Sequence, residues 1–338
     1  MPACPPRCHR HRAGTCTGGS QAAARANNRD LPTRAGGRSL GMTATLSRGR
    51  QRTRAMYAVE RLKDREAIRN LLWSERAYAA YALAQLDPGL FRLSEWFAAS
   101  GPDGAGLVLH SRGGLGRALF VLGHPTAIEA ALSLHPGPRF SFGSLRAEHR
   151  RSLERFFVCT RPQTMLRMSV TNPGFKRVVG EAVRLTGRDI AAINRLYATE
   201  SGSSAYHARH IDEGVYYGVS VNNLLVSIAG THVVSPSEGV AVVGNVFTHP
   251  LYRGQGLATI ATSAVTADLI ERCPLVVLTV ESENHPAVAV YHRLGYETQC
   301  TLHETPIIRR EPVGALSLYR RLTAGWRGRS EGKELVSR

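Results

Sequence analysis

Apolar and polar positions divide the chain into an unpatterned N-terminal tail and a long patterned region. Residues 1–55 are rich in Arg, Gly, Ala and Thr, show no apolar periodicity and contain hardly a large apolar side chain. Such a segment cannot bury enough surface to offset the entropy that ordering would cost. From Met56 onward, short apolar runs alternate with amphipathic segments. We therefore expect a disordered tail over 1–55, a natural start at Met56, and α/β structure after it.

The pattern from 56 to 175 predicts a first α/β half. A helix capped by Asp64 is expected to turn Ile68, Leu71 and Leu72 inward. A helical and loop segment is expected up to about Gly101. The remaining elements expected here are a strand at 58–62, a β-hairpin of 106–110 and 118–122 around Gly113-Gly114, a helix from Pro125 through 128–134, a charged helix at 146–156 and a strand at 165–170.

The pattern from 178 to 325 predicts a second α/β half. A helix that begins after the capping-box pair Thr186 and Asp189 is expected to bury Ile190, Ile193 and Tyr197. The strands expected in this half are 181–185, 215–221, 224–234, 240–248 and 275–280, with a helix from Leu257 between the last two. Residues 326–338 are expected to form a flexible C-terminal tail.

A weak internal repeat supports two similar halves. Ala58-Val59-Glu60-Arg61-Leu62 with Arg65-Glu66 recurs as Ala182-Val183-Arg184-Leu185 with Arg188-Asp189, about 123 residues later. In both places a strand leads into a helix. The repeat therefore indicates two domains of one type in tandem.

The chemically most informative stretch lies between the strand 240–248 and the helix that follows it. Gly254 and Gly256 fall in the turn before the helix, where they leave room for a group to approach the main chain. The first N–H groups of a helix converge there, and the helix dipole favours negative charge. The turn is therefore predicted to cradle a diphosphate. It is neither a Walker loop nor a dinucleotide fingerprint, because neither glycine pattern is present.

Two motifs in this half resemble the signatures of the GNAT superfamily of acyl-CoA-dependent N-acetyltransferases. The first is R-x-x-G-x-[GA], found here as Arg253, Gly256 and Ala258. The second follows the strand 275–280 and consists of Asn284, Tyr291 and the pair Gly295-Tyr296. The resemblance implies two GNAT-like mixed-sheet α/β domains in tandem: a degenerate one over 56–175 and a catalytic one over 178–325. The arrangement also resembles the FR47-like and glycine N-acyltransferase-like branches, although the motifs do not identify a branch.

The resemblance implies acetyl-CoA as co-substrate and no metal. Strands 240–248 and 275–280 would splay, so that the pantetheine arm adds to the freed strand edge. Tyr291 would be the general acid for the leaving thiolate, unless it is an ordinary core tyrosine. Asn284 would contact the pantetheine arm, or act as a helix N-cap, or both. The cofactor-binding residues implied are Val246, Phe247, Thr248, Arg253, Gly254, Gln255, Gly256, Leu257, Ala258, Thr259 and Asn284.

The general base is left open by the sequence. Strand 240–248 has no carboxylate, and Thr279 stands at the strand position where some relatives carry a Glu. The candidates are Glu281, Glu283, His249, His207, His210 and Glu213, or a water that relays the proton.

The resemblance implies an N-acetyltransferase that acts on a primary amine of a small molecule or amino compound. Two alternatives are a non-catalytic acyl-CoA-binding regulatory protein and a protein N-terminal acetyltransferase. The acceptor, the acyl-chain length and the oligomeric state, including a homodimer, are left open.

Charge, apolar run length and cysteine spacing argue against nucleic acid, membrane and zinc as partners of this chain. Of the net charge of +17, residues 1–55 carry +10, from eleven Arg and one acid, so no basic groove for nucleic acid is expected in the patterned region. No apolar run is long enough to span a membrane. The tail cysteines and histidines fit no usual zinc spacing, and the other cysteines show no paired spacing, so a reducing cytoplasm is expected.

Overall fold

The computed structural model describes residues 56–114, 116–200, 206–326 and 333–337. The predictions for the tail 1–55, including its zinc alternative, lie outside the described residues. At the other end, part of the expected flexible tail lies within them: β14 (Glu334–Ser337) pairs antiparallel with β1 (Met56–Leu62). Among the residues that the structure describes, no helix has both the length and the apolar character needed to cross a membrane.

The first half follows the predicted alternation of strands and helices. After β1 its elements are α1 (Arg65–Trp73), α2 (Ala80–Ala84), α3 (Pro88–Phe91), β2 (Ser94–Gly101), β3 (Gly104–Ser111), β4 (Ala118–Gly123), α4 (Pro125–Leu134), β5 (Phe140–Leu145), η1 (Ala147–His149), α5 (Arg150–Glu154), β6 (Phe157–Cys159), β7 (Gln163–Val170) and η2 (Asn172–Gly174).

The second half repeats the alternation. Its elements are β8 (Val183–Arg184), η3 (Gly187–Asp189), α6 (Ile190–Ala198), α7 (Ala208–Glu213), β9 (Tyr217–Val221), β10 (Leu224–Ser235), η4 (Pro236–Glu238), β11 (Val240–Thr248), η5 (Pro250–Tyr252), α8 (Leu257–Ile270), β12 (Leu275–Glu281), α9 (His285–Arg293), β13 (Glu297–Arg309) and α10 (Ala315–Trp326).

The two halves share one topology, which confirms the tandem mixed α/β fold. In the first half four antiparallel strands, β1 to β4, are followed by α4 and by β5, which pairs parallel to β4. In the second half β8 to β11 are followed by α8 and by β12, which pairs parallel to β11. The capping box of Thr186 and Asp189 is formed as predicted.

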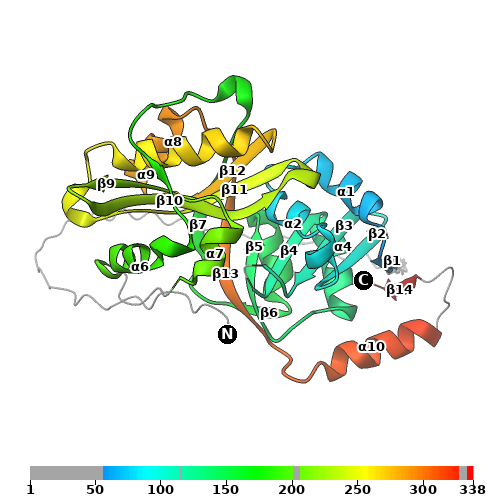
Figure 1. Cartoon of the computed structure of the whole chain (residues 1–338). Helices are drawn as coiled ribbons and strands as arrows, with labels where there is room; N and C mark the ends of the chain where they lie inside the picture. The colour runs from blue at the N-terminus through cyan, green and yellow to red at the C-terminus, as the bar shows by residue number, and fades with distance from the viewer. Residues whose placement is uncertain (1–55, 115, 201–205, 327–332, 338) are drawn as a thin grey trace, which may run out of the picture. The chain divides into compact units, whose positions relative to one another are not determined.

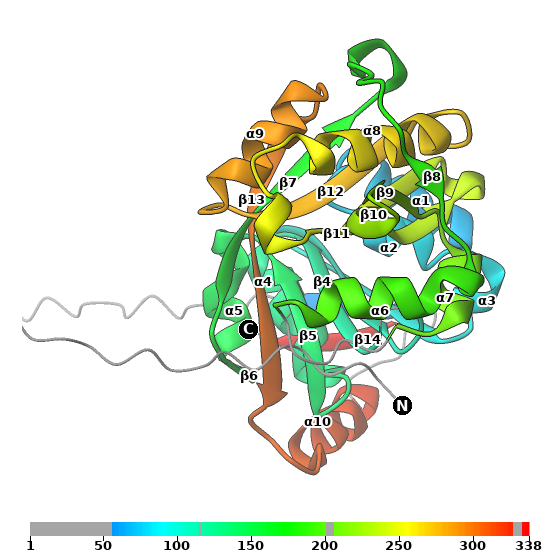
Figure 2. The ribbon, with the colours of Figure 1, turned by 60° about the vertical axis from the view of Figure 1, so that its left-hand side comes forward.

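The halves exchange strands, so that the described strands form one sheet. β7 of the first half pairs with β12, and β13 of the second half pairs with both β5 and β7. Figure 2 shows β13 as the long strand that runs between the halves toward α10. Each half therefore completes its sheet with a strand from the other.

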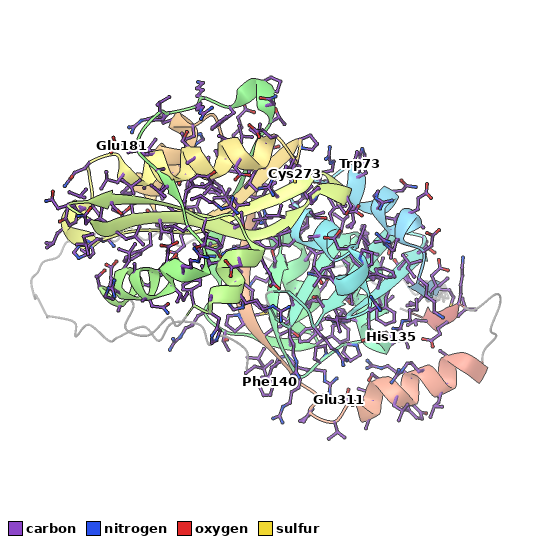
Figure 3. All side chains as sticks on the ribbon, in the orientation of Figure 1. Trp73, His135, Phe140, Glu181, Cys273 and Glu311 are labelled. Carbon is purple, nitrogen blue, oxygen red and sulfur yellow. The ribbon has the colours of Figure 1, made fainter. Side chains whose placement is uncertain are left out.

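Helices cover both faces of this sheet. In the second half α8 and α9 lie on one face and α6 on the other (Figure 1). Ile68 and Leu72 of α1 and residues of α2 share one apolar cluster with Val240 and Val277 of the second half. Arg69 of α1 donates two hydrogen bonds of 2.7 Å to the buried carboxylate of Glu238 in η4. Trp73 at the end of α1 and Cys273 before β12 are labelled in Figure 3.

Several predicted elements were wrong or incomplete. The segment up to Gly101 contains β2, which the pattern hides because Trp96, Phe97 and Ala99 are buried on both faces of the strand. Leu71 is 46% exposed, since α1 packs along its Ile68 and Leu72 stripe.

Other predicted boundaries shift by a few residues. The charged helix at 146–156 is reduced to η1 and α5, and β5 and β6 on either side of it were not predicted. The hairpin of 106–110 and 118–122 is confirmed as β3 and β4.

Candidate active site

The parallel strands β11 and β12 separate toward their carboxyl ends. Their pairing runs from Val240–Leu275 to Val243–Leu278 and stops there, although β11 continues to Thr248 and β12 to Glu281. A bulge in β11 lies just beyond the last pair, where Asn245 has a φ of 54°. The β12-facing edge of β11 over 246–248 is thus left without a strand partner among the described residues. The predicted pantetheine-binding residues Val246, Phe247 and Thr248 lie on this edge.

The turn that follows β11 has an open, uncapped helix N-terminus. Gly254 and Gly256 have φ values of 78° and 77°, a region that side-chain-bearing residues rarely adopt. A Cβ on either glycine would have no atom within 4 Å. Gly256 is the N-cap of α8, and no side chain caps the helix. The amides of the first turn, from Leu257 to Thr259, therefore have no intrahelical acceptor and fit the predicted diphosphate cradle.

Arg253 fixes this turn to its surroundings. Its Nε donates to the carbonyl oxygen of Thr248 at 3.2 Å, and its two Nη atoms pair with the carboxylate of Glu200. The guanidinium also lies 5.9 Å from the centre of the Phe247 ring. The signature arginine thus connects the cradle to the end of β11.

Asn284 is the N-cap of α9. Its side-chain oxygen accepts a hydrogen bond of 3.2 Å from the amide of Ala287, and Pro286 stands in the first turn. The N-cap interpretation of Asn284 is therefore confirmed, and its contact with the pantetheine arm stays a prediction.

Tyr291 lies on α9 and is 7% exposed. Burial raises the pKa of its phenol to about 12. Its ring meets that of Tyr296 edge-on at 6.1 Å, and the Tyr296 hydroxyl lies 2.8 Å from that of Thr266. Tyr291 is therefore a weaker acid than the ordinary phenol, with a pKa of about 10, on which the predicted role relied.

Most side chains predicted as candidates for the general base are exposed to solvent. Glu281, Glu283, His207, His210 and Glu213 are exposed, and His249 is partly buried. Several already have partners. Glu213 pairs with Arg209 at 2.6 Å, Glu281 accepts from Gln163 at 3.0 Å, and His249 accepts from the amide of Leu251 at 3.2 Å.

A polar network that the sequence interpretation missed lies where β11 and β12 separate. The Tyr81 hydroxyl of α2 lies 2.7 Å from Nδ1 of His232 on β10, and Nε2 of His232 lies 3.2 Å from Oδ1 of Asn245. Because an amide oxygen only accepts, Nε2 carries the proton and Nδ1 accepts from Tyr81. Burial lowers the pKa of His232, so the imidazole is neutral near pH 7. Asn245 also accepts from Tyr206 at 2.9 Å and donates to Tyr216 at 2.9 Å.

A buried arginine extends this network. Arg167 of β7 is 1% exposed, donates to the hydroxyl of Thr279 on β12, and lies 5.0 Å from the centre of the Tyr81 ring. Burial raises the pKa of Glu304 on β13, and the charge of Arg167 opposes that rise. We call Tyr81, Arg167, His232, Asn245, Thr279 and Glu304 the junction cluster. One sequence signal could have revealed it: Arg167 interrupts the otherwise apolar run Met165-Leu166-Arg167-Met168.

The described residues of the first half form no corresponding cradle. Only His124 separates β4 from α4, whereas residues 249–256 separate β11 from α8. A Cβ on Gly123 would collide with the carbonyl oxygen of Ala105. Pro125 at the start of α4 also lacks an N–H. The first half therefore cannot hold a diphosphate in the way that the second half can.

Comparisons with known proteins point to the same segment. The sequence profile of the acetyltransferase (GNAT) family matches residues 189–296, which include β11, the cradle, α8, β12 and α9. An acetyltransferase of Yersinia pestis (strain Pestoides F) is 40% identical over 55 residues, or 16% of this chain. The match spans 39% of that relative's length.

Solved structures resemble the chain over a larger span. A Drosophila protein aligns with a TM-score of 0.53 at 11% identity, covering 75% of this chain and 98% of the other, which shows a common fold. A tandem GNAT protein from the clavulanic acid biosynthesis pathway aligns with a TM-score of 0.44 at 13% identity, covering 76% of this chain and 99% of the other.

Proposed function

We propose that the chain transfers an acetyl group from acetyl-CoA to a primary amine of a small molecule or amino compound, since residues 189–296 match the acetyltransferase (GNAT) family. One observation carries the proposal: β11 and β12 separate beside an uncapped, open helix N-terminus at Gly256. A free strand edge suits the amide-rich pantetheine arm, and an uncapped helix start suits a diphosphate.

Each part of the site has a separate task. The amides from Gly254 to Thr259 bind the diphosphate. The free edge over 246–248 binds the pantetheine amides, and one of its N–H groups stabilises negative charge on the carbonyl oxygen under attack. The bound thioester supplies an activated acyl carbon that a neutral amine attacks directly. Tyr291 returns a proton to the leaving sulfur, which its raised pKa makes harder by about 3 kcal/mol relative to an ordinary phenol.

A second candidate function is acyl-CoA binding without turnover, as a regulatory protein. Two observations favour it: β11 carries no carboxylate, and burial makes Tyr291 a weak acid. Measured turnover with any amine would exclude this candidate.

The test is calorimetric titration of acetyl-CoA into the full chain and into Gly256→Glu, which places bulk and negative charge in the cradle. Gly116→Glu is the matched control, because Gly116 also has a positive φ, of 111°, and open space around its Cβ position. We expect binding by the parent and by Gly116→Glu and at least about 100-fold weaker binding by Gly256→Glu. A folded parent that does not bind acetyl-CoA would refute the proposed function.

A further inference from the structure

Arg167 is a buried cation without an anionic partner. No Asp or Glu oxygen of the described residues lies within 4.0 Å of its guanidinium. Its Nε is buried without a hydrogen-bond partner, and Nη1 donates to the neutral hydroxyl of Thr279. A buried charge without a pair is strongly destabilising unless something compensates for it.

The compensation within the chain is incomplete. The Tyr81 ring offers a cation–π contact at 5.0 Å, and the Tyr81 hydroxyl interacts with the guanidinium as a hydrogen-bond acceptor. Glu304 interacts with Arg167 from beyond ion-pair distance. Arg309 shows what a structural arginine has in this fold. Its Nε, Nη1 and Nη2 donate to the carbonyl oxygens of Glu311, Gly137 and Pro312 at 2.7, 2.6 and 3.0 Å. No carbonyl oxygen in the described part of the chain accepts a hydrogen bond from the Arg167 side chain.

Arg167 lies at the point where the reacting groups would meet. In the sheet it stands opposite Thr279, the first residue of β12 beyond the last pair with β11, Val243–Leu278. The other members of the junction cluster are partly buried, whereas Arg167 itself is fully buried. The side chain with the unpartnered Nε therefore belongs to a residue next to the separated strand ends.

We propose that the acceptor amine carries a carboxylate and that Arg167 binds it. The inference rests on the proposed function and names its substrate class, an amino carboxylate such as an amino acid. A guanidinium holds a carboxylate through paired hydrogen bonds, which fixes the acceptor's orientation as well as its charge. In the reaction a C–N bond forms to the acyl carbon, the C–S bond breaks, the thiol leaves with the proton that the amine loses, and the carboxylate is unchanged.

The proposal gives the first half a task in the reaction. Arg167 and Tyr81 come from β7 and α2 of that half, whereas the cradle and the free edge belong to the second half. Acceptor selection and cofactor binding are then divided between the halves. The exchange of β7 places Arg167 against β12.

The experiment measures thiol release by the full chain with acetyl-CoA and pairs of acceptors that differ only in the carboxylate, namely amino acids and their primary amides. We expect kcat/KM to be about 100-fold or more higher for the acids. Arg167→Gln is expected to abolish that preference, chiefly through KM for the acceptor, with the calorimetric affinity for acetyl-CoA unchanged. Arg167→Lys keeps the charge without the fork and is expected to retain part of the preference. If Arg167→Gln does not fold, Arg167→Lys tests the inference in its place.

The experiment separates failure of the carboxylate inference from failure of the proposed acetyltransferase function. Equal turnover of acids and amides, or a preference that survives in both folded variants, overturns the inference and leaves the proposed function in place. A second arm replaces acetyl-CoA with succinyl-CoA, since the carboxylate could instead be on the acyl group. An Arg167-dependent selection for succinyl-CoA, without selection among acceptors, also overturns the assignment. Failure of the folded parent to bind acetyl-CoA removes both proposals.

Discussion

Tyr81 and His232 form a hydrogen bond of 2.7 Å across 151 positions of sequence and across the border between the two halves. The bond places a helix of the half without a cradle against the strands that carry the cradle. Through Asn245 it also connects to the bulge at which β11 turns away from β12.

Replacing Tyr81 by Phe should weaken the association of the halves. The change removes the donor to Nδ1 of His232 and leaves a buried acceptor unpaired, which we expect to cost about 1–2 kcal/mol in the free energy of unfolding. Urea unfolding measures the loss. Tyr319→Phe on α10 is the control, because Tyr319 is 63% exposed. Equal stability of the two variants would contradict the prediction.

Tyr291→Phe should lower turnover and spare stability, whereas Tyr296→Phe should lower stability and spare turnover. Removal of the Tyr291 hydroxyl should lower turnover about 100-fold with little change in stability or acetyl-CoA affinity. Removal of the Tyr296 hydroxyl breaks its bond to Thr266, so stability should fall by about 1 kcal/mol with turnover kept. Both are measured by thiol release and thermal unfolding. If Tyr291→Phe retained full turnover, the general-acid assignment would be wrong.

The ion pair of Arg69 and Glu238 should contribute more to the free energy of unfolding than the exposed ion pairs do. Glu238 is 2% exposed, so Arg69→Leu leaves a buried carboxylate whose one remaining ion-pair partner among the described residues is Arg65, at 3.9 Å. We expect a loss of about 2 kcal/mol in unfolding free energy. Arg150→Leu, which breaks an exposed pair with Glu154, should cause no measurable change. An equal change in unfolding free energy for Arg69→Leu and Arg150→Leu would show that burial of Glu238 does not strengthen its ion pair.

Stability should fall in acid partly because of His110. Burial lowers the pKa of this imidazole to about 4, from about 6.5 in the unfolded chain, so the unfolded state binds the proton more readily between those values. The stability that the neutral His110 side chain contributes is fully present above pH 6.5 and is lost as the pH falls to about 4. Nε2 of His110 is bonded to the carbonyl oxygen of His135 at 2.9 Å, a bond that Gln can imitate.

Unfolding by urea at pH 7 and pH 4.5 should therefore differ between the parent and His110→Gln. The parent is expected to lose about 2–3 kcal/mol more than the variant over that interval. Parallel pH profiles would exclude His110 as a source of acid sensitivity.

The part of the site that lies within one stretch of chain could be predicted from sequence. The strand 240–248, the glycine turn and the helix from Leu257 are specified by local signals, namely apolar alternation and residues that tolerate a positive φ. The N-cap alternative for Asn284 is confirmed, and it too rests on a local signal, an Asn with Pro286 close behind it. What these residues bind stays a prediction.

The parts assembled from distant segments could not be predicted. The junction cluster brings together residues of α2, β7, β10, β11, β12 and β13, and no local pattern states that these elements meet. β5 was missed for a different reason. Phe140 and Phe142 are 50% and 40% exposed, so its larger apolar residues do not mark the buried face. The exchange of β7 and β13 likewise depends on long-range pairing alone.

The pairing of β5 with β13 imposes an order on how the chain folds as it is made. Residues 140–145 leave the ribosome long before residues 297–309, which cover one of their edges. During that interval the edge of β5 is open to unwanted pairing with other chains. A strand contact over such a sequence distance is also slow to form, because much loop entropy is lost first. We therefore expect synthesis that stops before β13 to leave an aggregation-prone nascent chain, even though most of the first half is already complete.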